Sequence, residues 1–344
     1  MSRANFLQVP GQLLQRWRSL STSSQRSNPS LPLPGLDHCL YRHTDTNGWE
    51  PISIPQSSLG VVGPSSTIPK FQIITWNIEF SVSHIEERTN GILDYIWNYV
   101  LTSASETLGT IPTILLFQEV ADEAFPAFLS HPFIQFNYDL TDISERNFRS
   151  YYGTITCIPR SLTPFVTAIN RVPFENSAMG RDVLIVDLDL PHFSNFRHSF
   201  PCRPESSRIR ICNTHLESLR GHGDRARPKQ LRHISQLLLN ADGGLVAGDM
   251  NCIAPTDNQV PASLGFTDAW EGIHPQAPLV HGYTWGYQPP SRRYPPGRLD
   301  KVLSLGKLTP VSIERFGVGQ RVEVEGSYFW LSDHYGLVAQ FTVG

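Results

Sequence analysis

Residues 71–79 read FQIITWNIE, and residues 114–119 read ILLFQE. Each segment starts as an apolar, β-branched run typical of a buried strand and ends in polar side chains, namely Asn77, Glu79 and Glu119. Strand ends from distant parts of a chain can converge at one edge of a sheet, where gathered carboxylates are costly unless a cation neutralises them. The two segments therefore predict a sheet that carries a cation site. For Glu119 the alternatives are a buried ion pair with an arginine and a solvent-facing strand end.

The rest of the chain contains further apolar runs that end in polar residues. They predict strands at residues 181–190, 208–213, 244–247, 299–305 and 336–343. Helices are predicted at residues 89–100 and 227–239, where the spacing of apolar residues is helical. These elements indicate a mixed α/β domain, and the lack of an internal repeat argues against solenoids and propellers.

Two more predicted strands are followed by groups suited to phosphate chemistry. Residues 213–218 read NTHLES, in which His215 and a nearby hydroxyl can bond non-bridging phosphate oxygens. Residues 248–251 read GDMN, and strand alternation places Asp249 and Asn251 on the same side of the chain. We expect one of these two to accept a proton from water and the other to donate to a developing oxyanion. Taken alone, a satisfied core histidine and an ordinary turn are the alternatives.

A histidine stands beside an acid near the C-terminus. Residues 332–334 read SDH, and Asp300 opens the preceding predicted strand. Asp333 next to His334 indicates metal or phosphate chemistry, and a second acid can hold the imidazole tautomer and favour its protonated form. A serine nucleophile does not fit, because the sequence has no G-x-S-x-G segment and neither candidate serine has a strand-turn-helix setting.

The composition is that of a globular enzyme. Of the 344 residues, 40% are hydrophobic and 17% are charged, which argues against disordered and fibrous classes. No apolar run approaches the roughly 18 to 20 residues needed to cross a bilayer. The five cysteines show no C-x-x-C spacing, which argues against a disulfide framework and a structural zinc site. We therefore expect a reducing compartment.

The N-terminal region differs in composition from the rest. Residues 1–66 are rich in Ser, Pro, Gln and Asn and are predicted to form a flexible tail, whereas residues 67–344 form the catalytic domain. The acid-free, arginine-containing start of the tail has the composition of a mitochondrial presequence. Because Pro10 interrupts the amphipathic helix that a presequence needs, a disordered terminus is the alternative. Deleting residues 1–66 is expected to leave activity nearly unchanged.

Charge is unevenly distributed along the chain. The formal net charge is -3, and because the first 36 residues contribute +4, the remainder carries -7. An anionic substrate must therefore be met by local basic patches and bound cations. One basic patch lies between residues 203 and 233, where eight cationic residues stand against three acids: Arg203, Arg208, Arg210, Arg220, Arg225, Arg227, Lys229 and Arg232 against Glu205, Glu217 and Asp224. For the residues beyond Arg220, an ordinary solvated helix face is the alternative.

Taken in order, the polar segments resemble the motifs of the endonuclease/exonuclease/phosphatase superfamily. Within it, the tyrosyl-DNA phosphodiesterase 2 subfamily is the nearest in motif. The matching segments are TWNI at 75–78, FQEV at 117–120, THLES at 214–218, RGH at 220–222, YTW at 283–285 and SDH at 332–334. The resemblance covers about residues 71–344. It implies a four-layered α/β/β/α sandwich of two packed mixed β-sheets flanked by helices.

The resemblance also implies a reaction and its catalytic groups. Glu119, with Asp333 nearby, would hold a Mg²⁺ ion, for which Mn²⁺ can substitute, in the hydrolysis of a phosphodiester. Asp249 would orient and deprotonate water, and Asp300 would orient His334. The side chains that would contact the phosphate are Asn77, His215, Asn251 and His334.

The substrate implied by the resemblance is DNA whose single-stranded 5′ end carries a tyrosyl adduct from a trapped topoisomerase-type protein. Cleavage would leave a 5′ phosphate, in DNA repair. Four residues would surround the link and the DNA end, where guanidinium and aromatic faces can stack on a ring or a base: Tyr152, Arg181, Ser218 and Trp285. We expect a monomer in the nucleus, without a membrane partner, with mitochondrion and cytoplasm as alternatives. Other functions that fit are an abasic-site or 3′-end DNA nuclease, a sphingomyelinase-like or inositol-phosphate hydrolase, and an inactive binding module.

The sequence departs from the family pattern at two positions. Glu79 stands where the family usually has Asp, so the longer side chain is expected to shift a water-mediated metal contact. Ile253 stands where the family has Arg, two residues beyond Asn251, so one cationic contact is missing. Both changes leave the hydrolytic centre intact and leave the identity of the leaving group open.

Overall fold

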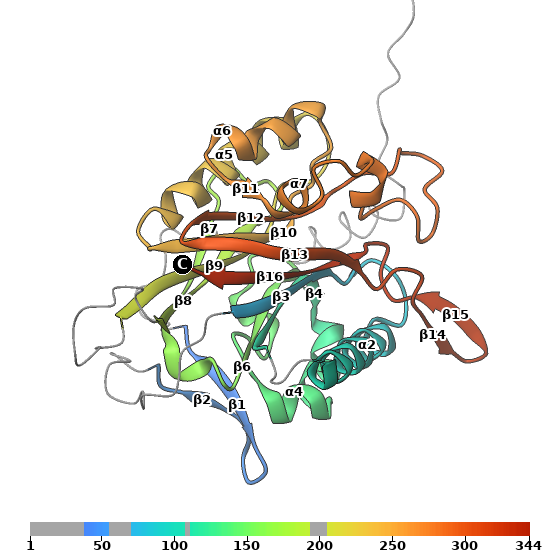
Figure 1. Ribbon diagram of the computed structural model, residues 1–344. Helices are drawn as coiled ribbons and strands as arrows, with labels where there is room; N and C mark the ends of the chain where they lie inside the picture. Colours follow the sequence, from blue (N-terminus) through green and yellow to red (C-terminus); the bar gives the residue numbers. More distant parts are fainter. Residues whose placement is uncertain (1–37, 55–69, 107–110, 193–204) are drawn as a thin grey trace, which may run out of the picture. The chain divides into compact units, whose positions relative to one another are not determined.

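The computed structural model describes residues 38–54, 70–106, 111–192 and 205–344. These residues form two β-sheets packed face to face, with helices against the outer face of each sheet (Figure 1). The architecture is the predicted four-layered α/β/β/α sandwich. Among the described residues, no helix has the length and apolar character that crossing a membrane requires.

The first sheet has eight strands in the order β13-β16-β3-β4-β6-β5-β1-β2. Their bounds are β1 Leu40–Thr44, β2 Gly48–Ile52, β3 Lys70–Asn77, β4 Thr113–Ala121, β5 Tyr138–Leu140, β6 Tyr152–Pro159, β13 Leu308–Phe316 and β16 Gly336–Val343. Only β3 and β4 pair in parallel in this sheet, as far as it is described. Three helices pack on its outer face: α2 Ile85–Glu106, α3 Phe125–Ser130 and α4 Pro132–Asn137.

The second sheet has six strands in the order β11-β12-β10-β9-β8-β7. Their bounds are β7 Val166–Pro173, β8 Asp182–His192, β9 Glu205–His215, β10 Gly243–Asp249, β11 Thr267–Asp268 and β12 Asp300–Gly306. The remaining elements are α5 His222–Leu238, α6 Val260–Ser263 and α7 Ala269–Ile273, with β14 Arg321–Val324 and β15 Ser327–Trp330 as a separate hairpin. Short 3-10 helices occupy Asp122–Ala124, Glu145–Asn147, Thr163–Phe165, Pro255–Gln259 and Leu279–Gly282. Helix α5 covers the outer face of this sheet.

The central strands are buried on both faces, which explains their uninterrupted apolar runs. In β3, Ile73 faces the core between the two sheets, whereas Ile74 packs with the helices outside the first sheet. In β10, Leu245 faces the same inner core and Val246 packs under α5. The seven predicted strands correspond to β3, β4, β8, β9, β10, β12 and β16, and the two predicted helices to α2 and α5.

Strand register brings the predicted polar residues to one end of the sandwich. In the second sheet, Asp249 pairs with His215 across the parallel pair of β9 and β10, and with Asp300 across the antiparallel pair of β10 and β12. A buried hydrogen bond joins the sheets close to this row, because Gln118 Nε2 donates to Asn213 Oδ1 at 2.8 Å. The ends of β3 and β4 in the first sheet therefore face the ends of β9 and β10.

Residues 40–52 differ from the tail predicted over residues 1–66. They form the β1–β2 hairpin, and β1 pairs with β5 in the first sheet. Arg42 holds the buried Asp139 carboxylate with two hydrogen bonds of 2.8 and 2.6 Å, and Trp49 Nε1 donates to a carbonyl of α3. The sandwich therefore starts before residue 67. The strands are short and half-exposed, so they lack the apolar run that identifies a central strand. The predicted presequence lies outside the described residues.

Candidate active site

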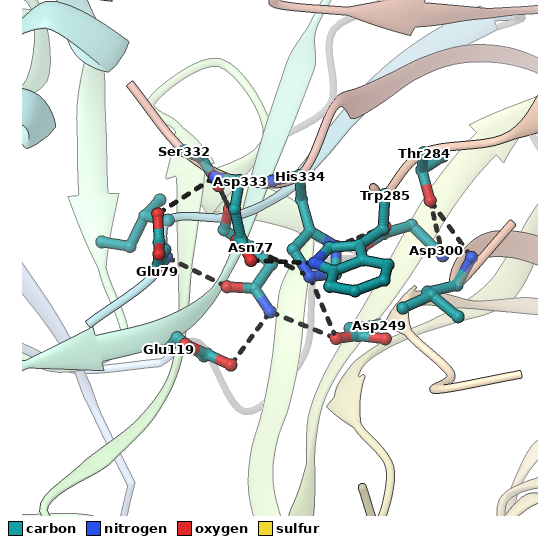
Figure 2. A network of polar contacts seen from close by, with 12 residues as sticks. Asn77, Glu79, Glu119, Asp249, Thr284, Trp285, Asp300, Ser332, Asp333 and His334 are labelled. Carbon is teal, nitrogen blue, oxygen red and sulfur yellow. Dashed lines mark hydrogen bonds and ion pairs between the residues drawn. The ribbon is translucent and has the colours of Figure 1, made fainter. Parts of the chain in front are cut away.

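Asn77, at the end of β3, joins the two sheets inside the site (Figure 2). Its Nδ2 donates to Glu119 Oε1 and to Asp249 Oδ2, at 3.2 Å in both cases. Its Oδ1 accepts a hydrogen bond from the backbone N–H of Glu79 at 3.0 Å. The predicted metal residue, Glu119, and the predicted water-binding residue, Asp249, are therefore held by one amide.

Three residues of the site have left-handed backbone geometry. The φ angles of Glu79, Glu119 and Asn251 are 57°, 58° and 46°. This conformation costs a non-glycine residue roughly 1 to 3 kcal/mol and persists where surrounding contacts enforce it. Glu79 and Asn251 each lie two residues beyond the end of a strand, whereas Glu119 lies within β4, where the pairing with β6 is irregular. The backbone therefore bends at each of the three points where these side chains enter the site.

Three carboxyl groups near Asn77 lie close enough for their charges to interact: those of Glu79, Glu119 and Asp333. Burial, together with the charges of Asp333 and Glu119, raises the pKa of Glu79 to about 8, although an arginine on α2 opposes the shift. Burial also raises the pKa of Asp333, to which the charge of Glu119 contributes. A cation would relieve this repulsion, and a set of carboxylate oxygens suits Mg²⁺. The donor set therefore fits the predicted ion.

Asp249 lies between two histidines. His215 Nε2 is 3.3 Å and His334 Nε2 is 3.8 Å from Asp249 Oδ2, and the backbone N–H of Asn251 donates to Oδ1 at 2.8 Å. Burial by itself would raise the pKa of Asp249, but these three neighbours hold it below the usual range of an aspartate. Asp249 is therefore ionised at neutral pH and can accept a hydrogen bond from water.

His334, in the segment before β16, is paired with Asp300, the first residue of β12 in the second sheet. The distance between His334 Nδ1 and Asp300 Oδ2 is 2.7 Å. Burial alone would lower the pKa of His334, but the carboxylates of Asp300, Asp333 and Asp249 raise it well above the ordinary value. His334 is therefore an imidazolium at neutral pH, as predicted for a histidine backed by an acid. Thr284 fixes the acid in turn, because its hydroxyl accepts from the backbone N–H of Asp300 at 3.1 Å.

A second group of residues has the spacing of metal ligands. Asp249, Asp300 and His334 offer ligand atoms that all lie within 4.8 Å of one another. A protonated imidazole whose Nδ1 already bonds Asp300 does not bind a metal, because ligation requires the neutral ring. The chemistry of the donors therefore favours the carboxylates of Glu79, Glu119 and Asp333 for a hard cation.

Arg181 determines the tautomer of His215. Arg181 Nη1 lies 2.9 Å from His215 Nδ1. Because a guanidinium can only donate, Nδ1 must accept, and the ring proton is on Nε2. This N–H faces the Asp249 carboxylate, with Nε2 3.3 Å from Oδ2. His215 therefore directs an N–H donor into the site beside Asp249.

The four predicted substrate residues fall into two groups. Arg181 Nη2 donates to Ser218 Oγ at 3.2 Å, and the guanidinium lies 4.9 Å from the ring centroid of Tyr152. Together with His215, Tyr152 and Arg181 line a small hollow. Trp285 is apart from this group and donates through Nε1 to Asp333 Oδ2 at 2.8 Å (Figure 2).

Asn251 and Ile253 follow β10. Asn251 Nδ2 donates to the carbonyl of Leu216 at 3.0 Å, so one of its two N–H bonds is committed to the backbone. Ile253 exposes 37% of its surface and supplies no charge where the family pattern has an arginine. Of the residues predicted to contact the phosphate, His215 lies on β9 and Asn251 follows β10, both in the second sheet, whereas Asn77 and His334 belong to the side of the first sheet.

Arg88 on α2 is a residue of the site that the sequence patterns missed. It is 1% exposed and donates to the carbonyls of Ile78, Glu79, Trp330 and Leu331. Its Nη2 also donates to Glu79 Oε2 at 2.9 Å. Arg88 thus fastens the chain after β3 to the chain that leads into the SDH segment. An arginine within a helical segment carries no signal of such a role.

Glu217 of the THLES segment was predicted only as part of the motif. It is 1% exposed, and its carboxylate accepts from Ser177 Oγ at 2.6 Å and from the backbone N–H of Ala178 at 3.0 Å. Ser177 Oγ accepts in turn from the backbone N–H of Arg181 at 2.9 Å. Glu217 therefore positions the loop that delivers Arg181 to His215.

The fold matches known structures, although no protein-family model and no curated protein matches the sequence. TDP2 from Caenorhabditis elegans aligns with a TM-score of 0.58 and 22% identity over 80% of this chain and 74% of that chain. TDP2 from D. rerio, complexed with a single-strand DNA product, gives 0.57 and 20% over 80% and 99%. An endonuclease/exonuclease/phosphatase from Beutenbergia cavernae gives 0.51 and 16% over 80% and 72%. These similarities confirm the fold that the motifs predicted.

Proposed function

We propose that this protein is a magnesium-dependent phosphodiesterase that hydrolyses 5′-phosphotyrosyl bonds between DNA and a trapped protein, leaving a 5′ phosphate. The proposal rests on the protonation states of three neighbouring side chains. An ionised Asp249 lies between a protonated His334 and a His215 with its proton on Nε2, and three carboxyl groups lie nearby. Phosphoryl transfer needs this combination, because the enzyme must position a water and stabilise charge on the phosphate oxygens.

The reaction is the attack of a water oxygen on phosphorus. A new P–O bond forms, the bond between phosphorus and the tyrosine oxygen breaks, and the proton of the water passes to Asp249. His215 Nε2–H and His334 Nε2–H donate to the non-bridging oxygens, and Asp300 keeps His334 protonated and oriented. Asn77 holds the Asp249 carboxylate in place.

Glu119, with Glu79 and Asp333 beside it, would hold the magnesium ion. When bound, Mg²⁺ supplies positive charge to the phosphate and to the departing oxygen. This assignment has a direct test that does not depend on turnover. Mg²⁺ should raise the melting temperature of the wild type, and the shift should disappear in Glu119→Gln. An equal shift in both proteins would remove Glu119 from the metal site.

The group formed by Tyr152, Arg181 and Ser218 supports a phosphotyrosyl link as the substrate. A guanidinium held against an aromatic ring can stack on a second ring and still face a phosphate. Trp285, which is held by its hydrogen bond to Asp333, offers a further aromatic face. The fold similarity to a TDP2 structure with a single-strand DNA product supports DNA as the polymer. We propose that the protein acts as a monomer in DNA repair in the nucleus.

One comparison of substrates tests the proposal. With Mg²⁺ present, an oligonucleotide bearing a 5′-phosphotyrosine should be cleaved faster than an abasic duplex, a 3′-blocked duplex, sphingomyelin or an inositol phosphate. Ile253 stands where the family pattern has an arginine, which leaves the identity of the leaving group open. The comparison with the abasic duplex is therefore the most informative one. A higher kcat/KM for the abasic or 3′-blocked duplex would assign the protein to DNA nucleases of the same fold. A preference for sphingomyelin or inositol phosphates would exclude a nucleic-acid substrate.

A further inference from the structure

Helix α5 carries a row of cationic side chains on its exposed face. Arg225, Lys229 and Arg232 recur at intervals of four and three residues, which places them on one side of a helix, and all three are exposed. The exposed His222 extends the row to the start of the helix. The opposite face, which includes Ile234, is buried against the second sheet. We call Arg225, Lys229 and Arg232 the α5 stripe.

The charges of the α5 stripe have no internal counter-ion in the part of the chain that the structure describes. The ion pairs of α5 involve other residues: Asp224 pairs with Arg220 and Arg227, Arg227 also pairs with Asp257, and His222 Nε2 lies 4.0 Å from Glu217 Oε1. The carboxylate of Glu217 is buried and directed at the Arg181 loop. One exposed acid, Glu175, lies on the adjoining loop, but no acid is among the exposed residues of α5 itself.

The stability of the helix does not explain the stripe. Cations stabilise a helix near its C-terminus, yet α5 has no basic residue in its last turn. Arg225 and Lys229 stand four residues apart, and like charges at this spacing destabilise a helix by about 0.2 to 0.5 kcal/mol. The α5 stripe is exposed, costs the helix stability and has no counter-ion among the residues that the structure describes, so it suits an external polyanion.

The row begins beside the active site. His222 Nε2 lies 3.0 Å from the carbonyl oxygen of Asn176, on the loop that carries Arg181. The chain between β9 and α5 includes Ser218, whose hydroxyl bonds Arg181. From His222 to Arg232 the helix rises roughly 15 Å. Over that length, one DNA strand presents about four phosphates.

We propose that the α5 stripe is a docking surface for the phosphodiester backbone of the DNA whose end occupies the active site. The proposal rests on the proposed function only in taking DNA as the substrate. The scissile link sits among His215, Arg181 and Tyr152, and the backbone beyond it follows the exposed face of α5. The stripe therefore adds affinity for longer substrates without taking part in the chemistry.

The test compares two triple variants with the same change in net charge. The stripe variant is Arg225→Gln, Lys229→Gln and Arg232→Gln. The control variant is Lys70→Gln, Arg208→Gln and Lys307→Gln. These three exposed cations lie at strand ends remote from the site, at the start of β3, within the first residues of β9 and after β12. All six side chains are exposed, so both variants should keep the melting temperature of the wild type.

The probe is a duplex of about 20 base pairs with a short 5′ single-stranded end that carries a phosphate. In the stripe variant, Kd at low salt should rise at least tenfold, and the slope of log K against log salt should become shallower by roughly 2 to 3, since each phosphate contact contributes about 0.9. In the control variant the slope should change by less than about 1. Equal losses in both variants, or no loss in the stripe variant, would refute the docking surface.

A short substrate separates docking from catalysis. The nitrophenyl ester of thymidine 5′-monophosphate ends before the stripe, so the stripe variant should hydrolyse it with the kcat/KM of the wild type. A matching loss on this ester would show that the stripe acts on the active site and would overturn the proposal. If the wild type cleaves no phosphotyrosyl DNA but binds the duplex through the stripe, the proposed function fails and the docking surface stands. Stripe-dependent binding to phosphatidylserine vesicles, with DNA binding unaffected, would assign the stripe to a membrane instead.

Discussion

At the scale of single residues, the site depends on the protonation states that neighbouring groups impose. Asp249 is buried and nevertheless ionised, because two imidazoles and a backbone N–H face it. His334 is buried and nevertheless protonated, because three carboxylates surround it. These opposite states, side by side, allow one group to take a proton from water while the other stabilises negative charge on the phosphate.

The first prediction concerns the charge of His334. The folded-state pKa of His334 is raised, so the imidazolium is present below that raised pKa and is lost as the pH rises through it. Asp300→Asn removes the first of the acids that raise this pKa. The alkaline limb of kcat/KM should move to lower pH, and activity at neutral pH should fall on the order of 100-fold. Thr284→Ser keeps the hydroxyl that holds Asp300 and is the control. An alkaline limb that stays in place would contradict the role given to Asp300.

A second prediction separates the metal residue from the water-binding residue. Glu119→Gln and Asp249→Asn should each lower kcat by several orders of magnitude, as removal of a central catalytic group usually does. Calorimetry should show that Glu119→Gln loses Mg²⁺ binding while Asp249→Asn retains it. A loss of activity under about tenfold in either variant would remove that residue from the mechanism.

At the scale of elements, the buried Arg88 connects α2 to two strand ends. Its guanidinium bonds carbonyls on both sides of the site and the carboxylate of Glu79. The segments that it joins carry Glu79 and Asp333, whose backbone N–H also donates to Glu79 Oε2 at 3.1 Å. Helix α2 therefore determines the spacing of two of the three carboxylates, although it contributes no ligand.

The third prediction follows from this connection. Arg88→Met leaves Glu79 and several carbonyls without their buried partner, so the free energy of unfolding should fall by about 3 to 5 kcal/mol. Adding Glu79→Gln to Arg88→Met removes the buried carboxyl group that has lost its partner and should restore part of that loss. Urea unfolding measures both effects. A change below about 1 kcal/mol in Arg88→Met would show that the arginine does not hold these segments together.

At the scale of the whole molecule, the two sheets must be held in one relative position for the site to exist. Asn77 and Glu119 come from the first sheet, whereas His215, Asp249 and Asp300 come from the second. The buried bond between Gln118 and Asn213 links the sheets just behind the site. A shift of one sheet against the other would separate Asn77 from Asp249.

The fourth prediction concerns where this unit begins. Deleting residues 1–37 should leave the free energy of unfolding and the activity unchanged. Deleting residues 1–66 removes the β1–β2 hairpin, exposes the edge of β5 and leaves the buried Asp139 without Arg42. We expect this longer deletion to cost about 2 to 5 kcal/mol and to promote aggregation through the bare edge. Denaturant unfolding and light scattering distinguish the two deletions. Equal stability of the two deletion variants would show that residues 38–54 do not stabilise the domain and belong to the tail.

Much of the fold could be predicted from the sequence, because the strands at the centre of each sheet are buried on both faces. Strands β3, β4 and β10 therefore read as apolar runs that end in polar residues. The short strands β1, β2 and β5 could not be recognised in the same way. Strands β6, β7 and β13 were also not predicted, since polar and apolar residues alternate irregularly along them. Their pairing depends on partners elsewhere in the chain, which no local window contains.

The residues of the site could likewise be named from the sequence, because strand ends and short motifs mark Asn77, Glu119, His215, Asp249 and His334. Their protonation states and supporting contacts could not be predicted from the sequence. The tautomer of His215 depends on Arg181, 34 positions away, and Arg88 bonds a carbonyl 243 positions away. The sequence by itself determined which side chains stand at strand ends, since a strand that is buried on both faces is a continuous apolar run whose end is marked by polar residues. Only the tertiary structure decided their charges and supports, because those depend on distances between segments that meet through packing alone.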